Sequence, residues 1–241
     1  MPGTMARMTE RATASALDLA RDVRPGRYGK ADKKHIVNPV IEPRWSGLRL
    51  IGAVEHGQAV LLDEGVPLTG RDELVGALAA ATAGRADAVI IDGFLTRQIV
   101  SDVATTAELV ELPTAREFLI QGMVGARSNP TKDATKRIAS DIEARTFAPG
   151  EVLNVVAIDL LHLDGEWLLD VPLLERKRLL EAVLAAGELV RPSPYVRPPV
   201  DTWLGSWRAQ GFTGISYRAA NSFYLPGEPN PEWTTTPMPK R

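Results

Sequence analysis

The stretch Ile41-Glu42-Pro43-Arg44-Trp45-Ser46-Gly47-Leu48-Arg49 carries more information about the architecture than any other part of the sequence. An apolar run over 37–41 leads into it, and a strand-like apolar run continues from it over 48–54. His56-Gly57 then predicts a hairpin turn into another strand over 58–62. The region is therefore expected to form short antiparallel strands.

The rest of the chain alternates between the two hydrophobic periods without a regular βαβ order. Apolar spacing typical of helices occurs over 74–83, 133–145, 172–190 and 200–210. Continuous apolar runs typical of buried strands occur over 87–91, 152–158 and 212–218. This pattern predicts a mixed α+β fold with antiparallel hairpins. No glycine-rich phosphate loop of either common kind is present.

The composition of the 241 residues excludes several classes of protein. Cysteine is absent, which excludes disulfides, thiolate metal sites and cysteine nucleophiles. The three histidines, His35, His56 and His162, lack the spacing of a zinc site, and no metal site is predicted. The net charge is −2, so nucleic-acid binding would require a local basic patch. No apolar run approaches the ~18 residues of a membrane span, and we expect a cytoplasmic protein.

The chain divides into three regions by composition. Residues 1–34 are expected to be a polar, solvated leader with a short helix over 9–22. Residues 35–227 are expected to form the folded domain, in which the segment 97–150 looks like a divergent insertion. Residues 228–241 are rich in proline and are expected to be a tail.

Three further pairs of motifs follow the first stretch in a fixed order. They are Leu68-Thr69-Gly70-Arg71 with Ile90-Ile91-Asp92-Gly93-Phe94, Val156-Ala157-Ile158-Asp159-Leu160-Leu161-His162-Leu163-Asp164-Gly165 with Val171-Pro172-Leu173-Leu174-Glu175-Arg176-Lys177-Arg178-Leu179-Leu180, and Gly211-Phe212-Thr213-Gly214-Ile215-Ser216-Tyr217-Arg218 with Asn221-Ser222-Phe223-Tyr224-Leu225-Pro226-Gly227. Each motif alone is weak, but the ordered set, which covers about 37–233, is fairly specific.

The set resembles the nucleotidyltransferase (adenylation) domain of ATP-dependent DNA ligases. The family patterns read E-P-K-W-D-G-x-R, D-G-E, F-D-L-L-Y-L-D-G with P-L-x-E-R-R-x-L-L, and G-x-E-G-x-V-x-K with D-S-x-Y-x-P-G. The resemblance implies an α+β, ATP-grasp-like nucleotidyltransferase fold in which two antiparallel sheets, packed with helices, enclose a nucleotide cleft. It also implies ATP and Mg²⁺ as cofactors.

Most of the matched positions hold residues that are wrong for adenylyl transfer. Arg44 matches the family's nucleophilic lysine, and a guanidinium stays protonated and is a poor nucleophile. Phe94 and Thr213 match the two glutamates, which weakens the case for magnesium. Ile158 matches the aromatic residue that stacks on adenine, and Arg218 matches a phosphate-binding lysine. Further departures are Ser46 for the first motif's aspartate and Thr235 and Pro237 for the lysines of a terminal W-x-K-x-K pattern.

Glu42 and Arg49 are retained, and in family members these positions line the nucleotide pocket. The resemblance therefore implies a nucleotide-binding set of Glu42, Arg44, Arg49, Ile158 and Arg218, with no intact catalytic residue. The alternative is that Glu42 and Arg49 form a structural ion pair with each other. The Trp203/Trp207 pair, at helical i,i+4 spacing, indicates either packing or a base-stacking platform.

Three functional hypotheses follow. The first is a catalytically inactive pseudo-nucleotidyltransferase that binds a nucleotide, a nucleic-acid end or a protein partner. The second is an active DNA-repair ligase or nucleotidyltransferase that uses a displaced lysine such as Lys33 or Lys34. The third is an interaction or oligomerisation module built from 97–150 and the proline-rich tail. Residues 228–241 are too few for the OB-fold domain of active ligases, so we expect none in this chain.

Overall fold

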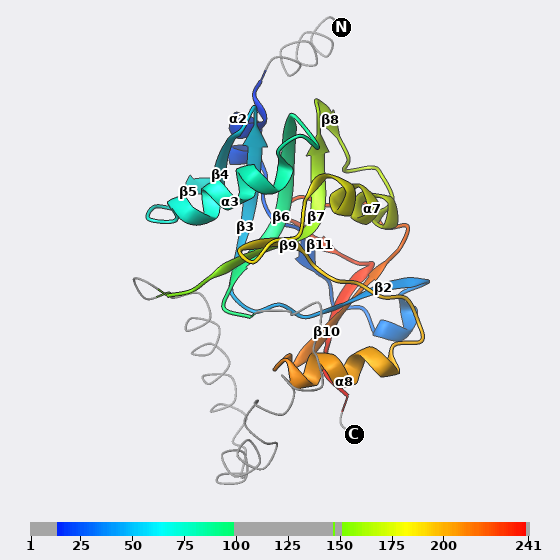
Figure 1. The fold of residues 1–241 in the computed structure, drawn as a ribbon. Helices are drawn as coiled ribbons and strands as arrows, with labels where there is room; N and C mark the ends of the chain where they lie inside the picture. Colours follow the sequence, from blue (N-terminus) through cyan, green and yellow to red (C-terminus); the bar gives the residue numbers. More distant parts are fainter. Residues whose placement is uncertain (1–13, 99–146, 148–150, 240–241) are drawn as a thin grey trace, which may run out of the picture.

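The computed structural model describes residues 14–98, 147 and 151–239, which fold into two antiparallel sheets flanked by helices (Figure 1). The larger sheet has the strand order β5-β4-β3-β6-β7-β8, and β9 adds to β7 in parallel. Its strands are β3 (Leu48–Glu55), β4 (Gln58–Asp63), β5 (Val66–Pro67), β6 (Ala88–Thr96), β7 (Asn154–Leu163), β8 (Glu166–Trp167) and β9 (Val190–Pro192). The predicted α+β fold is confirmed.

The smaller sheet has the order β12-β10-β2 and lies below the larger one in Figure 1. Its strands are β2 (Pro39–Pro43), β10 (Gly214–Ala219) and β12 (Trp233–Pro237), and a separate short pair joins β1 (Arg27–Tyr28) to β11 (Pro229–Asn230). Gly47 connects β2 to β3 with a φ of 135°. A Cβ at this position would come within 2.1 Å of the Leu95 carbonyl oxygen, so only glycine fits this crossing.

Helices cover both faces of the larger sheet. On one face, α3 (Asp72–Thr82) and α7 (Leu173–Val183) pack their leucines against apolar residues of β3, β6 and β7. On the other face lies α2 (Ala16–Asp22), whose small residues Ala16 and Ala20 allow a close approach to Ile51 and Ile90. Burial on both faces explains why these strands are continuous apolar runs in the sequence.

The smaller sheet has its own apolar core against α8 (Asp201–Ala209). Trp207 of this helix packs with Phe212 and Ile215, and Trp45 meets the Phe212 ring edge-on at 4.9 Å between centroids. Trp203, one helical turn before Trp207, is 48% exposed. Of the tryptophan pair that the sequence interpreted as either packing or a base-stacking platform, only Trp207 enters this core.

Parts of the expected leader and of the expected proline-rich tail are packed into the fold. In the expected leader, α2 begins at Ser15, whose hydroxyl accepts a hydrogen bond from the Asp18 N–H, and Ala20 is fully buried. In the expected proline-rich tail, β12 pairs with β10 along its length and Trp233 is fully buried. Trp233 anchors this segment because its ring packs against Tyr28 and Tyr224.

Helix and turn positions follow the sequence pattern closely, but one helix ends early. His56 and Gly57 both have positive φ, as the predicted hairpin turn requires. The helix expected over 172–190 ends at Val183, because the chain turns back through a Gly187 N–H to Val190 carbonyl hydrogen bond into β9. The helix expected over 133–145 lies outside the described residues.

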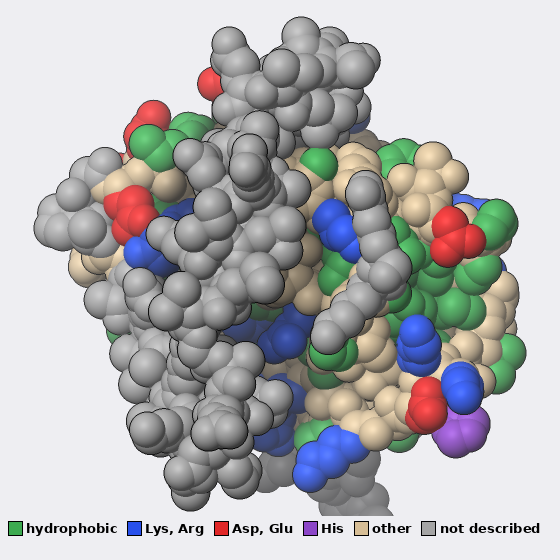
Figure 2. All heavy atoms as spheres, turned by 90° about the horizontal axis from the view of Figure 1, so that it is seen from below, with side chains coloured by type: hydrophobic (Ala, Val, Ile, Leu, Met, Phe, Trp, Pro, Cys, Tyr) green, Lys and Arg blue, Asp and Glu red, His purple; other side chains and the backbone are tan. Residues whose placement is uncertain are grey.

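Two features of the surface bear on binding partners. Within 14–98, 147 and 151–239, no helix is long and apolar enough to cross a membrane. Figure 2 views the molecule from below, at the end where α8 lies, and shows Lys and Arg side chains both within this face and at its edges, where Asp and Glu side chains also lie.

The packing of β12 predicts unequal effects for two tryptophan substitutions. Trp233→Ala removes a fully buried ring and is expected to lower the free energy of unfolding by about 3–5 kcal/mol. Trp203→Ala, at a half-exposed ring, is the matched control and is expected to cost less than about 1 kcal/mol. Urea denaturation followed by circular dichroism measures both, and equal losses would contradict a packed β12.

Candidate functional site

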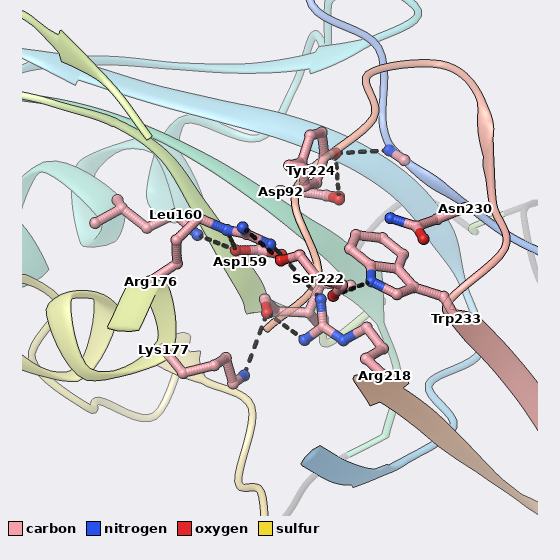
Figure 3. A network of polar contacts seen from close by, with 12 residues as sticks. Asp92, Asp159, Leu160, Arg176, Lys177, Arg218, Ser222, Tyr224, Asn230 and Trp233 are labelled. Atoms are coloured by element: carbon pink, nitrogen blue, oxygen red, sulfur yellow. Dashed lines mark hydrogen bonds and ion pairs between the residues drawn. The ribbon is translucent and has the colours of Figure 1, made fainter. Parts of the chain in front are cut away.

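A buried cluster of charged side chains connects the two sheets (Figure 3). Glu42 of β2 accepts a hydrogen bond from Lys177 Nζ of α7 at 2.7 Å, and two from the Arg218 guanidinium of β10 at 3.0 and 2.5 Å. Lys177 also donates to the carbonyl oxygens of Ile158 and Ser193. The three charged side chains are at most 2% exposed, so Glu42 is fully occupied by protein cations.

Arg218 also connects Glu42 of the smaller sheet to the larger sheet. Its Nη1 donates to the Asp159 carboxylate of β7 at 2.9 Å, and Arg176 of α7 grips the same carboxylate with two hydrogen bonds of 2.7 and 3.0 Å. Asp159 lies directly opposite Asp92 in the β6–β7 register. Facing carboxylates repel each other, so the register is favourable only because each has its own arginine.

Arg49 is the arginine that forms an ion pair with Asp92. Its Nε and Nη2 donate to the two Asp92 oxygens, both at 2.5 Å. The Tyr224 hydroxyl also donates to Asp92 at 2.6 Å and accepts the Gly26 N–H at 2.6 Å. The Arg49 guanidinium lies 4.7 Å from the centre of the Phe94 ring, a cation–π contact. Arg49 is therefore held from two sides by protein groups.

These contacts shift the pKa values of the buried groups. Burial raises the pKa of Glu42, but Arg218 and Lys177 more than offset this and hold it below its ordinary value of 4.5. Burial likewise opposes ionisation of Asp159, and Arg176 with Arg218 keeps its pKa below 3.8. Burial lowers the pKa of Lys177 in spite of the attraction of Glu42. Burial and the Asp92 charge raise the pKa of Tyr224.

Arg44 lies apart from this cluster, at the end of β2. Its N–H donates to the Gly214 carbonyl at 2.9 Å, and its side chain is exposed. The side chain crosses Gly214 so closely that a Cβ there would come within 2.9 Å of Arg44 Cδ. Among the described residues the Arg44 guanidinium contacts no carboxylate. Within the described part of the chain, no carboxylate neutralises this charge.

Arg44 lies on the face of the smaller sheet that carries the cluster. Alternation along β10 puts Gly214, Ser216 and Arg218 on one face, and the register aligns them with Pro237, Thr235 and Trp233 of β12. The stacking of Arg218 on the Trp233 ring, 5.0 Å from its centre, agrees with this assignment. This face thus runs from a buried ionic end to an open end at Arg44.

Comparisons with known proteins agree with this architecture. No protein-family model matches the chain. The DNA ligases of Methanocorpusculum labreanum and Natronomonas pharaonis are 26% and 28% identical over 56% of this chain, and the match spans 26% of each relative. The ligase domain of M. tuberculosis LigD superposes with a TM-score of 0.58 and 18% identity, covering 88% of this chain and 58% of that one.

A second structure, a mycobacterial DNA ligase D complexed with ATP and MES, gives a TM-score of 0.58 and 19% identity, covering 88% of this chain and 59% of that one. The chain resembles the nucleotidyltransferase domain of ATP-dependent DNA ligases. The matched region is about a quarter of the curated ligases, and the structural matches extend over more than half of the solved chains.

The two retained residues of this ligase-like domain, Glu42 and Arg49, take part in its ion pairs with buried side chains. Glu42 and Arg49 do not pair with each other, as the structural alternative supposed, but each forms a separate ion pair, with Lys177 and Arg218 and with Asp92. Arg218 is fully buried. The structure thus brings Glu42 and Arg218 together and separates both from the exposed Arg44.

The substituted residues of the ligase-like domain lie at less buried positions. Ser46 is exposed and donates its N–H and hydroxyl to Gln98 Oε1, at 2.8 and 2.9 Å. Thr213 is exposed immediately before β10, and Phe94 is half-buried under Arg49. Ile158 and Arg218 are the exceptions: Ile158 is 1% exposed in the core against α8, and Arg218, which stands at the position of a lysine, is fully buried.

Lys33 and Lys34 were proposed from the sequence as displaced nucleophiles. They lie on the side of the smaller sheet that faces away from the ion-pair cluster. Lys33 Nζ sits 5.7 Å from the centre of the Tyr217 ring. Tyr217 packs with the α8 core and alternates with Arg218, so it belongs to the face away from the cluster. Lys34 is exposed in the same short 3₁₀ turn.

Sequence reasoning missed the roles of Arg176, Lys177 and Tyr224, although it quoted all three within motifs. A signal was available in Glu175-Arg176-Lys177-Arg178, where four charges follow each other on a helix with an apolar face. Because a helix turns 100° per residue, some of these charges must point inward. Arg176 and Lys177 do, whereas Glu175 and Arg178 form an exposed pair with each other.

The buried cluster predicts a large cost for removing one charge. Glu42→Gln leaves Lys177 and Arg218 with an excess of buried positive charge and is expected to lower the free energy of unfolding by about 3–5 kcal/mol. The control Glu175→Gln, in an exposed pair, is expected to change it by less than about 1 kcal/mol. Adding Lys177→Met to Glu42→Gln should recover part of the loss in urea denaturation. Additive losses would argue against direct pairing.

The same cluster predicts a dependence of stability on pH. The folded-state pKa values of Glu42 and Asp159 are lowered, so their stabilisation is complete above the unfolded-state values near 4 and is lost as pH falls through the folded-state values. The free energy of unfolding, measured by urea denaturation between pH 7 and pH 3, should fall more steeply for the unmodified protein than for Glu42→Gln/Lys177→Met, by up to about 1.4 kcal/mol per pH unit. Parallel curves would contradict the assignment.

Proposed function

We propose that this chain is a non-catalytic relative of the ligase nucleotidyltransferase domain, which binds a nucleotide, or the phosphate of a nucleic-acid end, without forming a covalent adenylate. The observation that carries the proposal is Arg44, at the position where the resemblance implies a nucleophilic lysine. A guanidinium remains protonated and has no lone pair for attack on a phosphorus atom. Its planar donors suit the oxygens of a phosphate, so binding is compatible with loss of the chemistry.

The arrangement of the other lysines supports the proposal over an active enzyme. Lys177 is 1% exposed and its ammonium group already donates to three acceptors, which leaves no lone pair and no path for ATP. Lys33 contacts the opposite face of the smaller sheet from Arg44. Of the seven lysines in the sequence, Lys132, Lys136 and Lys240 lie outside the described residues.

An interaction module receives less support. The proline-rich segment that suggested it forms β12, and its Trp233 is buried, so it is not a free peptide for a partner. Most of the other segment, 97–150, lies outside the described residues. We retain nucleotide or phosphate-end binding in the cytoplasm as the proposed role.

The proposal is tested by equilibrium dialysis with α-labelled ATP, followed by denaturation of the same samples. We expect label to be retained by the native protein and released completely in denaturant. Arg44→Gln should weaken binding about tenfold, because it removes a charge-assisted contact. Arg85→Gln, at an exposed arginine that follows α3 and donates to the Ala182 carbonyl of α7, is the control and should bind like the unmodified protein.

Two results would overturn the proposal. Label that stays on the denatured protein would restore the enzyme hypothesis, and peptide mapping would then identify the nucleophile; loss of label in Lys33→Ala/Lys34→Ala would assign it to those residues. Absence of binding by the native protein, or equal binding by Arg44→Gln, would remove the nucleotide role of this site.

A further inference from the structure

The residues at the matched carboxylate positions do not fit a divalent cation. Magnesium in proteins is held by oxygen ligands, preferably carboxylates. At the first position the Phe94 ring lies under the Arg49 guanidinium, 4.7 Å from ring centre to Cζ, so an apolar face and a cation occupy that place. At the second position Thr213 offers a neutral hydroxyl beside the Gly214 that Arg44 crosses. Neither position supplies a charged ligand.

The carboxylates that remain nearby are already neutralised. Asp92 is bound by Arg49 and by the Tyr224 hydroxyl, and Glu42 by Lys177 and Arg218. Asp159 is gripped by two arginines. All three carboxylates are at most 2% exposed. Across the part of the chain that the structure describes, no group of three or more acidic or histidine side chains could hold a metal ion.

The charge left at the open end of the smaller sheet is positive. The Arg44 side chain is exposed and contacts no carboxylate among the described residues, and its neighbours Ser46 and Thr213 are uncharged. A bound Mg²⁺ would lower the negative charge of a nucleotide and thus weaken its attraction to such a site.

We propose that this chain binds its phosphate-bearing ligand as the free anion, with no divalent cation, and that Arg44 neutralises the phosphate charge. This inference rests on the proposed nucleotide binding and adds how the charge of the ligand's phosphate is neutralised. It assigns Thr213 and Phe94 the role of excluding the metal.

The test is isothermal titration of the full chain with ATP, once in excess EDTA and once in excess MgCl₂. We expect the affinity in EDTA to equal or exceed that in MgCl₂. An affinity at least tenfold higher in MgCl₂ would overturn the inference while leaving nucleotide binding intact. No binding in either buffer would instead overturn the proposed function, so the two failures are distinguishable.

A charge added at Thr213 gives a second, independent test. Thr213→Glu adds a carboxylate at an exposed position, one residue before the Gly214 that the Arg44 side chain crosses. We expect the affinity for ATP in EDTA to fall by about threefold or more, and MgCl₂ to restore part of it. Thr213→Gln, of the same size and without charge, should bind like the unmodified protein. Equal affinities for the Glu and Gln variants in EDTA would overturn the placement of the phosphate at this end of the smaller sheet.

Discussion

The Arg218 guanidinium is the interaction on which the rest of the structure depends, because it binds Glu42 of the smaller sheet and Asp159 of the larger one. A buried arginine between two carboxylates costs desolvation energy that only complete hydrogen bonding offsets. Here α7 completes the hydrogen bonding, since Lys177 pairs with Glu42 and Arg176 pairs with Asp159. The helix, the two sheets and the Trp233 ring under Arg218 are thereby fixed relative to one another.

This constraint gives a physical reason why some positions hold the same residue as the ligase motifs. Glu42, Arg49, Asp92 and Asp159 are partners in buried ion pairs, and loss of any one would leave an unpaired charge in the interior. Arg44, Ser46 and Thr213 are exposed and contribute no such pair, so they are free to change without unfolding the chain. The buried ion pairs that join the two sheets therefore do not depend on which residues stand at these exposed positions.

Local features of the fold were predictable from the sequence. The hairpin at His56-Gly57 and the strands on either side follow from turn chemistry and apolar runs, and both sheets lie within the expected α+β class. Composition misled at the two ends, because a proline-rich segment can still form a strand when one large ring is buried, as Trp233 is.

The ion-pair cluster could not be predicted in the same way. Glu42 lies 135 residues from Lys177 and 176 from Arg218, and Tyr224 meets Gly26 across 198 residues. Nothing local in the sequence assigns such partners, since hydrophobic periodicity describes only one element at a time. The resemblance implied a ligand role for Glu42 and Arg218, and in the structure these two side chains form an ion pair with each other.

The central claim is that this chain has the ligase-like fold with its buried ion pairs but does not form a covalent adenylate. The intact mass of the protein after incubation with ATP and MgCl₂ tests this claim most directly. The account predicts a mass identical to that of the untreated chain, because Arg44 cannot attack the α-phosphate. A species heavier by one adenylate would contradict it and would show that another residue of this chain has taken over the role of the nucleophile.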